Sequence, residues 1–80
     1  MAQRNIGLSL IKLKKFPEAE IALKEAIGHQ MHAGAYFNLC HALFHQDKFK
    51  EAESAIREAI KLDDSNARYK RELGVILHKQ

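Results

Sequence analysis

Apolar residues recur every three to four positions along most of this chain, which is the spacing of one face of an α-helix. Near the start, for example, Ile6, Leu10 and Leu13 share one stripe, while Arg4 and Lys12 lie elsewhere. Only one Pro and four Gly occur in the 80 residues, and this scarcity of helix breakers favours helices over a sheet with many turns. The pattern therefore predicts an all-α protein with five helices, at about residues 2–14, 17–27, 35–45, 50–62 and 67–79.

Local signals predict where these helices begin and end. Pro17 is well placed as a first helical residue, because its missing amide proton costs nothing there. Gly28 is a natural stop for the second helix. The polar cluster 63–66 predicts a turn, with Ser65 or Asn66 as the N-cap of the last helix.

The segment 16–27 recurs at 49–60, and eight of the twelve aligned residues are identical. A fixed offset of 33 residues is typical of a stacked helical repeat. Alanines occupy equivalent positions in both copies, namely Ala19, Ala22 and Ala26 in the first and Ala52, Ala55 and Ala59 in the second. Because a methyl side chain lets two helices approach closely, these alanines predict the seams between neighbouring helices.

Residues 33–66 form one full 34-residue unit of this repeat. Its small, apolar and turn positions are, in order, Tyr36, Leu39, Cys40, Leu43, Ala52, Ile56, Ala59 and Asp64. This spacing resembles the tetratricopeptide repeat family, whose pattern is W-x2-L-G-x2-Y, then A-x3-F, a second Ala and a closing Pro. Cys40 stands where the family has Gly, and Asp64 stands where it has Pro.

The resemblance implies a right-handed α-solenoid of antiparallel helix-turn-helix repeats, within a single domain that spans residues 1–80. Residues 1–32 would be the first repeat and residues 33–66 the second. The remaining segment, 67–80, is either a capping helix or the first half of a third repeat. The apolar residues that can pack inward from this helix are Tyr69, Leu73, Ile76 and Leu77.

The charge balance is mildly basic, with a net charge of +3 and a pI near 9.2. Such a surface attracts acidic partners without requiring nucleic acid. Basic clusters at 14–15 and 68–71 are not repeated from unit to unit, which makes single-stranded RNA binding a less favoured hypothesis. Glu20–Lys24 and Glu53–Arg57 are spaced i,i+4, and each pair is expected on an exposed face, where it adds roughly 0.3 kcal/mol.

Cysteine and hydropathy bear on the compartment. Cys40 is the only cysteine, so no intramolecular disulfide can form, and a single thiol fits a reducing compartment. The apolar stretch 6–13 is interrupted by polar residues and is too short to span a membrane. A cytoplasmic protein is therefore expected.

No set of residues predicts an enzyme. Cys40 and His41 are adjacent on a helix, so their side chains diverge by about 100° and cannot form a thiolate–imidazole dyad. His41 and His45 share one helical face, and the repeat arrangement would place His78 beside them, so these three are weak candidates for a metal site. No carboxylate or thiolate is placed to complete the set. We therefore predict no cofactor and no metal, and partly exposed histidines without a ligand are the simpler interpretation.

In the tetratricopeptide family, the first helix of each repeat lines an inner groove that takes up an extended peptide or a helix of another protein. The resemblance thus implies a scaffold that binds partner proteins, and a ligand that is apolar and acidic. The groove residues it implies are Arg4, Leu8, Ile11, Lys12, Phe37, Asn38, His41, Phe44, His45, Arg68, Arg71, Val75 and His78. An alternative is that Phe37 and Phe44 pack internally against a neighbouring repeat.

Two other functions remain as alternatives. One subfamily clamps the C-terminal carboxylate of chaperones, and Arg4, Asn38 and Arg68 match or replace its ligands. However, Leu8 replaces an Asn, and Glu72 replaces an Arg with an acid that would repel a carboxylate. In the second alternative, the chain is a segment of a larger repeat array, or associates with copies of itself through exposed helix ends.

Overall fold

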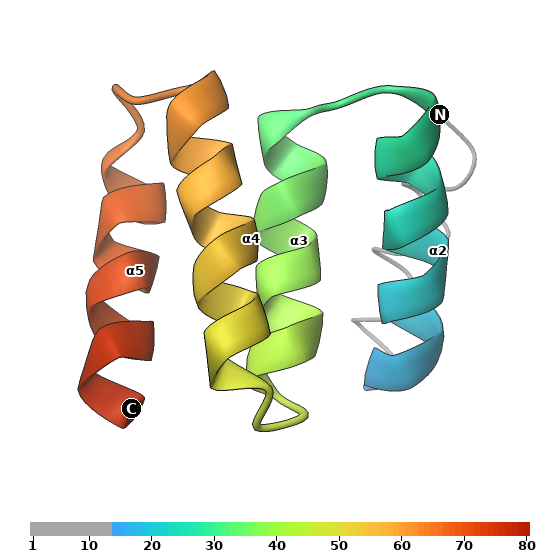
Figure 1. Cartoon of the computed structure of the whole chain (residues 1–80), viewed down its shortest axis with the longest axis horizontal. Coiled ribbons are helices and arrows are strands. Elements are labelled where there is room, and N and C mark those ends of the chain that lie inside the picture. The colour runs from blue at the N-terminus through green and yellow to red at the C-terminus, as the bar shows by residue number, and fades with distance from the viewer. Residues whose placement is uncertain (1–13) are drawn as a thin grey trace.

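A computed structural model of the chain describes residues 14–80, which form four α-helices side by side (Figure 1). The helices are α2 (Phe16–His29), α3 (Ala33–Phe44), α4 (Phe49–Leu62) and α5 (Ala67–Lys79). Consecutive helices are antiparallel and each packs on the next, with α2 and α5 at opposite ends of the row. All regular structure within residues 14–80 is helical, which confirms the all-α class. The first predicted helix, at 2–14, lies outside the described residues except for its last position.

The second helix is longer than predicted, because Gly28 does not end it. Helix α2 continues through Gly28 to His29, and Gly28 does not have the positive φ that a glycine stop uses. The helix ends at Gln30, whose backbone is extended and whose N–H donates to the carbonyl oxygen of Ala26. Glycine permits a left-handed stop but does not impose one, so the predicted end was wrong by two residues.

The other predicted ends agree with the structure to within two residues. Helix α3 begins at Ala33 and ends at Phe44, and α4 begins one residue before the predicted start. Helix α5 has the predicted bounds. Asn66 caps it, because its side-chain oxygen accepts a hydrogen bond of 3.0 Å from the N–H of Arg68.

The turns that lead into α2 and α4 have the same backbone geometry. Lys14 and Asp47 are 33 positions apart and have left-handed φ values of 61° and 62°. The next residues, Lys15 and Lys48, also match, with φ and ψ of −95° and 70° in one turn and −90° and 66° in the other. The sequence repeat is therefore a structural repeat. Lys14 lies in this turn and not in a helix, so the predicted end of the first helix was wrong.

The core follows the predicted seams. The buried apolar residues of the described chain are Ala19, Leu23, Ala35, Leu39, Cys40, Ala42, Leu43, Ala52, Ala55, Ile56, Ala59, Tyr69 and Ile76. All three seam alanines of α4 are buried, whereas on α2 only Ala19 is buried and Ala22 and Ala26 are half-buried. Leu77 was predicted to pack inward, but it is 46% exposed. No helix within residues 14–80 is long and apolar enough to cross a membrane.

Candidate functional site

Five aromatic rings form a continuous row across three helices. Phe16 of α2 stacks on His45, the C-cap residue of α3, with ring centroids 4.5 Å apart, and His45 is stacked 6.5 Å from His41. His41 meets the edge of Phe37 at 4.7 Å, and Phe37 contacts Tyr69 of α5 at 5.0 Å. We call these residues the aromatic row. Its centre exists because Phe37, His41 and His45 are spaced i,i+4 and so share one face of α3.

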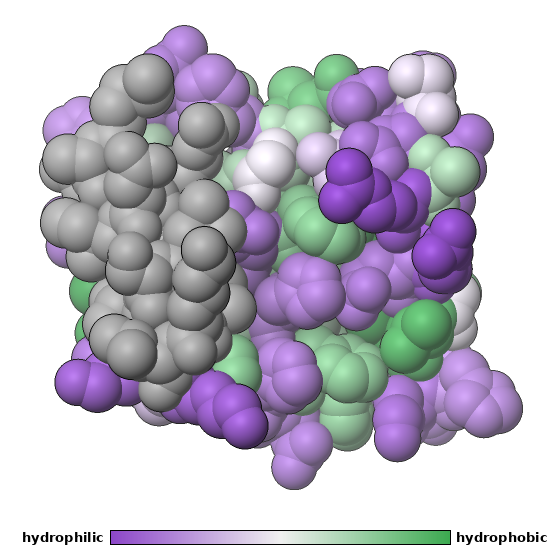
Figure 2. Space-filling model, turned by 180° about the vertical axis from the view of Figure 1, so that it is seen from behind, coloured by the Kyte–Doolittle hydropathy of each residue, from purple (hydrophilic) through white to green (hydrophobic). Residues whose placement is uncertain are grey.

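The aromatic row is only partly covered by the rest of the chain. Tyr69 is buried, Phe16 and Phe37 are half-buried, His41 keeps 34% of its side chain exposed and His45 is exposed. Because the Tyr69 ring is buried at one end and the two histidine rings are accessible at the centre, the row gives a rigid aromatic surface that a ligand can reach. One face of the molecule, seen from behind in Figure 2, carries separate hydrophobic side chains among hydrophilic ones.

A carboxylate lies beside the centre of the aromatic row. Oε1 of Glu72, on α5, is 4.0 Å from Nε2 of His41, and the Glu72 side chain is 18% exposed. This contact links α5 to α3, as the Phe37–Tyr69 contact does. When His41 is protonated, the two side chains form an ion pair, so the site combines aromatic surface with a local acid.

Cys40 lies directly behind this surface and is fully buried. Burial raises the pKa of its thiol to about 12, and the nearby Glu72 carboxylate adds to the increase. The thiol is thus protonated at physiological pH, and its small volume takes the place of the Gly that the family pattern has there. The prediction that Cys40 packs internally is confirmed, and its lack of reactivity stays a prediction.

We expect Cys40 to be unreactive toward a thiol reagent such as DTNB near pH 8 in the folded protein. Denaturation in urea should restore fast, stoichiometric labelling, because the thiol then regains water and an ordinary pKa. The measurement is the labelling rate with and without urea. Equal rates in the two conditions would show that the thiol is accessible.

The remaining predicted groove residues lie in different places. Phe44 is the last residue of α3. Its ring packs on Phe49 with centroids 5.4 Å apart and meets His45 edge-on at 5.8 Å, so it adjoins the aromatic row near one end. Asn38 is half-buried on α3. The predicted residues of α5 are exposed, and they are Arg68, Arg71, Val75 and His78. Arg4, Leu8, Ile11 and Lys12 lie outside the described residues. The structure thus brings together Phe37, His41 and His45, whereas the contact of Phe44 with Phe49 lies within residues 33–66 and not against a neighbouring repeat.

The three candidate metal ligands do not form a metal site. No group of three or more His, Cys, Asp or Glu side chains in the described part of the chain is placed to hold a metal ion. The rings of His41 and His45 are stacked with centroids 6.5 Å apart, and Glu72 lies 4.0 Å from His41.

Two members of the aromatic row were not among the predicted groove residues. Phe16 was assigned to a connector and Tyr69 to the core. The repeat carried no signal for Phe16: its equivalent Phe49 packs on Phe44 of the preceding helix, whereas Phe16 packs on His45 at the end of the following helix. For Tyr69 the sequence carried no signal that distinguishes a core residue from one that also borders a site.

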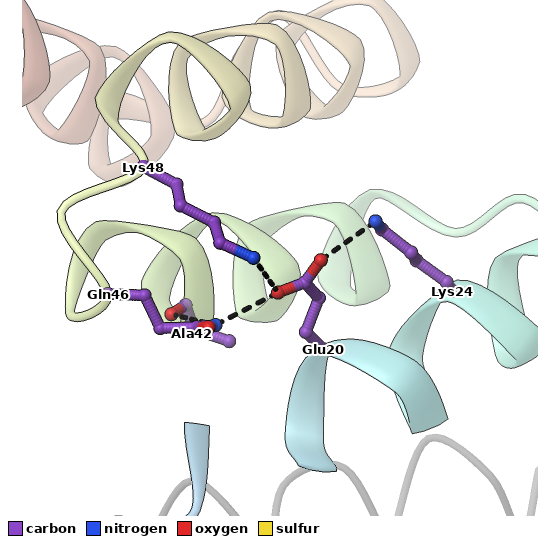
Figure 3. A network of polar contacts seen from close by, with 5 residues as sticks. All are labelled: Glu20, Lys24, Ala42, Gln46 and Lys48. Carbon is purple, nitrogen blue, oxygen red and sulfur yellow. Dashed lines mark hydrogen bonds and ion pairs between the residues drawn. The ribbon is translucent and has the colours of Figure 1, made fainter. Parts of the chain in front are cut away.

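A buried polar network lies between α2 and the α3–α4 turn (Figure 3). Glu20 is only 8% exposed, and it accepts hydrogen bonds from Lys24 at 2.8 Å, Gln46 at 3.0 Å and Lys48 at 3.1 Å. Gln46 also donates to the carbonyl oxygen of Ala42 at 3.0 Å. The hydrogen bond from Lys24 is the main cause that lowers the pKa of Glu20 to about 2. The Glu20–Lys24 pair was expected on an exposed face, and for Glu20 this was wrong.

A second, more exposed version of this network occurs one repeat later. Glu53 accepts hydrogen bonds from Arg57 at 2.8 Å and from Gln80 at 2.6 Å. These residues are the repeat equivalents of Glu20, Lys24 and Gln46. The hydrogen bond from Gln80, followed by that from Arg57, lowers the pKa of Glu53. These networks link α2 to the α3–α4 turn and α4 to the residue that follows α5.

Stacked antiparallel hairpins, a repeated turn and a repeated polar network define this chain as a helical-repeat protein. The family model of the tetratricopeptide repeat matches residues 33–66, the same residues that the sequence pattern marks as one full unit. Residues 33–66 therefore match one unit of the tetratricopeptide repeat family, and the fold of the described residues is consistent with it. Repeats of this family generally mediate protein–protein interaction and are typically not enzymes. A search of curated proteins gives no match to the chain.

Proposed function

We propose that this domain is a scaffold that binds a segment of another protein along the aromatic row and the adjacent face of α5. The observation that carries the proposal is the row itself, because aromatic rings from α2, α3 and α5 are held against one another and left partly accessible. Rigid aromatic anchors of this kind supply most of the energy of typical protein interfaces, since little side-chain entropy is lost when they bind.

The charges around the row indicate the chemistry of the ligand. Arg68 and Arg71 are exposed on α5, and Val75 is 43% exposed on the same side. These side chains suit an extended peptide or a helix with apolar and acidic side chains. Glu72 lies beside His41 at the centre of the row, so a free terminal carboxylate would be repelled there. We therefore favour an internal segment over a chaperone-type C-terminal tail. A reducing compartment such as the cytoplasm, which a single buried thiol fits, is part of the same proposal.

The proposal is tested by selecting short peptides from a random library against the domain. We expect the selected peptides to be rich in apolar and acidic residues. Val75→Glu and Arg71→Glu should each weaken peptide binding at least about tenfold. Ile21→Glu is the matched control, because Ile21 is 63% exposed and is not part of the aromatic row or of α5. Binding that is unchanged in both α5 variants would reject the proposed surface.

A second pair of variants separates ligand contact from packing. Phe37→Ala should abolish peptide capture while the circular dichroism spectrum stays helical. Ala52 is fully buried in a helix seam, so Ala52→Leu should instead destabilise the fold by about 1–3 kcal/mol. If Phe37→Ala unfolds the domain as much as Ala52→Leu does, the ring belongs to the core. Phe44 is a poorer probe, because truncating it also removes its contact with Phe49.

A further inference from the structure

Helix α5 keeps the same register against α4 that α3 keeps against α2. Gln46 donates to Glu20 at 3.0 Å, and Gln80, which is 34 positions later, donates to Glu53 at 2.6 Å. The two hydrogen bonds are repeat equivalents. Residues of α5 can therefore be compared with those of α3 at an offset of 34.

This comparison identifies two leucines of α5 that are more exposed to solvent than their equivalents on α3. Leu39 and Leu43 of α3 are 6% and 2% exposed. Their equivalents are Leu73, which is half-buried, and Leu77, which is 46% exposed. Helix α4 contributes the wall that closes over the α3 leucines. The described chain places no corresponding helix over α5.

A surface hollow lies beside Leu39 and Leu43 and another beside Leu73, and the two differ in which helices line them. The hollow above Leu39 and Leu43 has a volume of about 290 Å³ and is walled on the α4 side by Glu51, Ser54, Ala55 and Glu58. The equivalent hollow above Leu73 has a volume of about 250 Å³, and its lining residues all come from α4 and α5. We call this second surface the end face, and it consists of Arg57, Ile60, Lys61, Leu73 and Leu77.

Charge indicates what could cover the end face. In the first hollow, Lys24 lies opposite two acids of α4, Glu51 and Glu58, and the charge of Glu51 helps to raise the pKa of Lys24 after the main effect of Glu20. On the end face, Arg57 takes the position of Lys24, and its ion pair with Glu53 corresponds to that of Lys24 with Glu20. Lys61, whose side chain is 73% exposed and pairs with Glu58 at 3.3 Å, adds a second cation. A covering helix that carries acids at the positions of Glu51 and Glu58 would be complementary.

We propose that the end face binds an amphipathic helix of a partner protein whose contacting side is like that of α4. That side combines small residues spaced three and four apart, which allow close approach, with flanking glutamates. The leucines of α5 supply the apolar surface and the two cations of α4 orient the helix. This site is separate from the aromatic row and extends the domain from one binding surface to two.

The test uses a fluorescent synthetic peptide with the sequence of residues 49–62 and the 80-residue chain. Fluorescence anisotropy should show saturable binding. Leu77→Glu, at an already exposed position, should weaken this binding at least about tenfold. Ile21→Glu should leave the binding of this peptide unchanged. Val75→Glu and Arg71→Glu, which probe the proposed peptide site on the other side of α5, should also leave it unchanged. A peptide that carries Glu51→Lys and Glu58→Lys should bind less tightly than the parent peptide.

Other outcomes would overturn the proposal. An anisotropy that never saturates, or saturation that Leu77→Glu does not weaken, would show that the end face does not accept such a helix. Analytical ultracentrifugation of the chain alone tests whether a second copy of the chain occupies the end face instead. A dimer or polymer that dissociates to monomers in the Leu77→Glu variant would mean that a second copy of the chain covers this face. Val75→Glu and Arg71→Glu are measured in parallel with the library peptides. A negative result for the end face therefore does not bear on the proposed peptide-binding function.

Discussion

Replacing Ile56 by Ala should cost about 2–5 kcal/mol of the free energy of unfolding. Ile56 is fully buried on α4, the helix that contacts both α3 and α5, so the truncation removes apolar contacts and leaves a cavity. A domain of this size has a total stability of about 4–12 kcal/mol. The variant should therefore lose a large part of its stability, measured as the midpoint and free energy of urea unfolding by circular dichroism.

The repeat supplies a matched partner for this experiment. Leu23 is the equivalent of Ile56 on α2 and is also fully buried, so Leu23→Ala should cost a similar amount. Ile21→Ala is the control, because a side chain that is 63% exposed should change the stability by less than about 0.5 kcal/mol. If only one of Leu23→Ala and Ile56→Ala were destabilising, the two repeats would not bury equivalent faces, and if neither differed from Ile21→Ala, these side chains would not be core residues.

The sequence predicted the helices well where the signal was local or repeated. The repeat of 16–27 at 49–60 predicted α2 and α4 together, and the polar turn 63–66 predicted the cap of α5 at Asn66. Gly28 misled the prediction, because glycine can adopt either backbone conformation and the surrounding helix decided which one.

Only part of the candidate site could be predicted in the same way. The i,i+4 spacing of Phe37, His41 and His45 was enough to place them on one face of α3. Phe16 and Tyr69 join the aromatic row from other helices, so their membership depends on how α2 and α5 pack against α3. Spacing along one helix contains no information about that packing.

The Glu20 network shows the same limit for polar residues. The i,i+4 spacing predicted the pair with Lys24, but Gln46 and Lys48 reach Glu20 across 26 and 28 residues. These long-range hydrogen bonds turn a surface pair into a buried network. Glu53, at the equivalent position, has two of the three contacts and is more exposed.

Glu20→Gln should destabilise the protein by about 1–3 kcal/mol near pH 7, because the hydrogen bonds to Glu20 are charge-assisted and mostly shielded from water. Glutamine keeps the shape of the side chain but loses the charge that attracts Lys24 and Lys48. The measurement is urea unfolding of both proteins. Glu53→Gln is the control, and its effect should be smaller, since Glu53 lies at the more exposed of the two networks.

The pH dependence of this difference makes the test specific. The folded state lowers the pKa of Glu20 from 4.5 to about 2, so between these values the unfolded chain binds a proton that the folded protein does not. The stabilisation from Glu20 is therefore complete above pH 4.5 and is lost as the pH falls toward 2. The stability gap between the wild type and Glu20→Gln should narrow over that interval, whereas the gap for Glu53→Gln should change less. A Glu20→Gln gap that is the same near pH 2 as near pH 7 would mean that shape, and not the charge of Glu20, holds α2 against the α3–α4 turn.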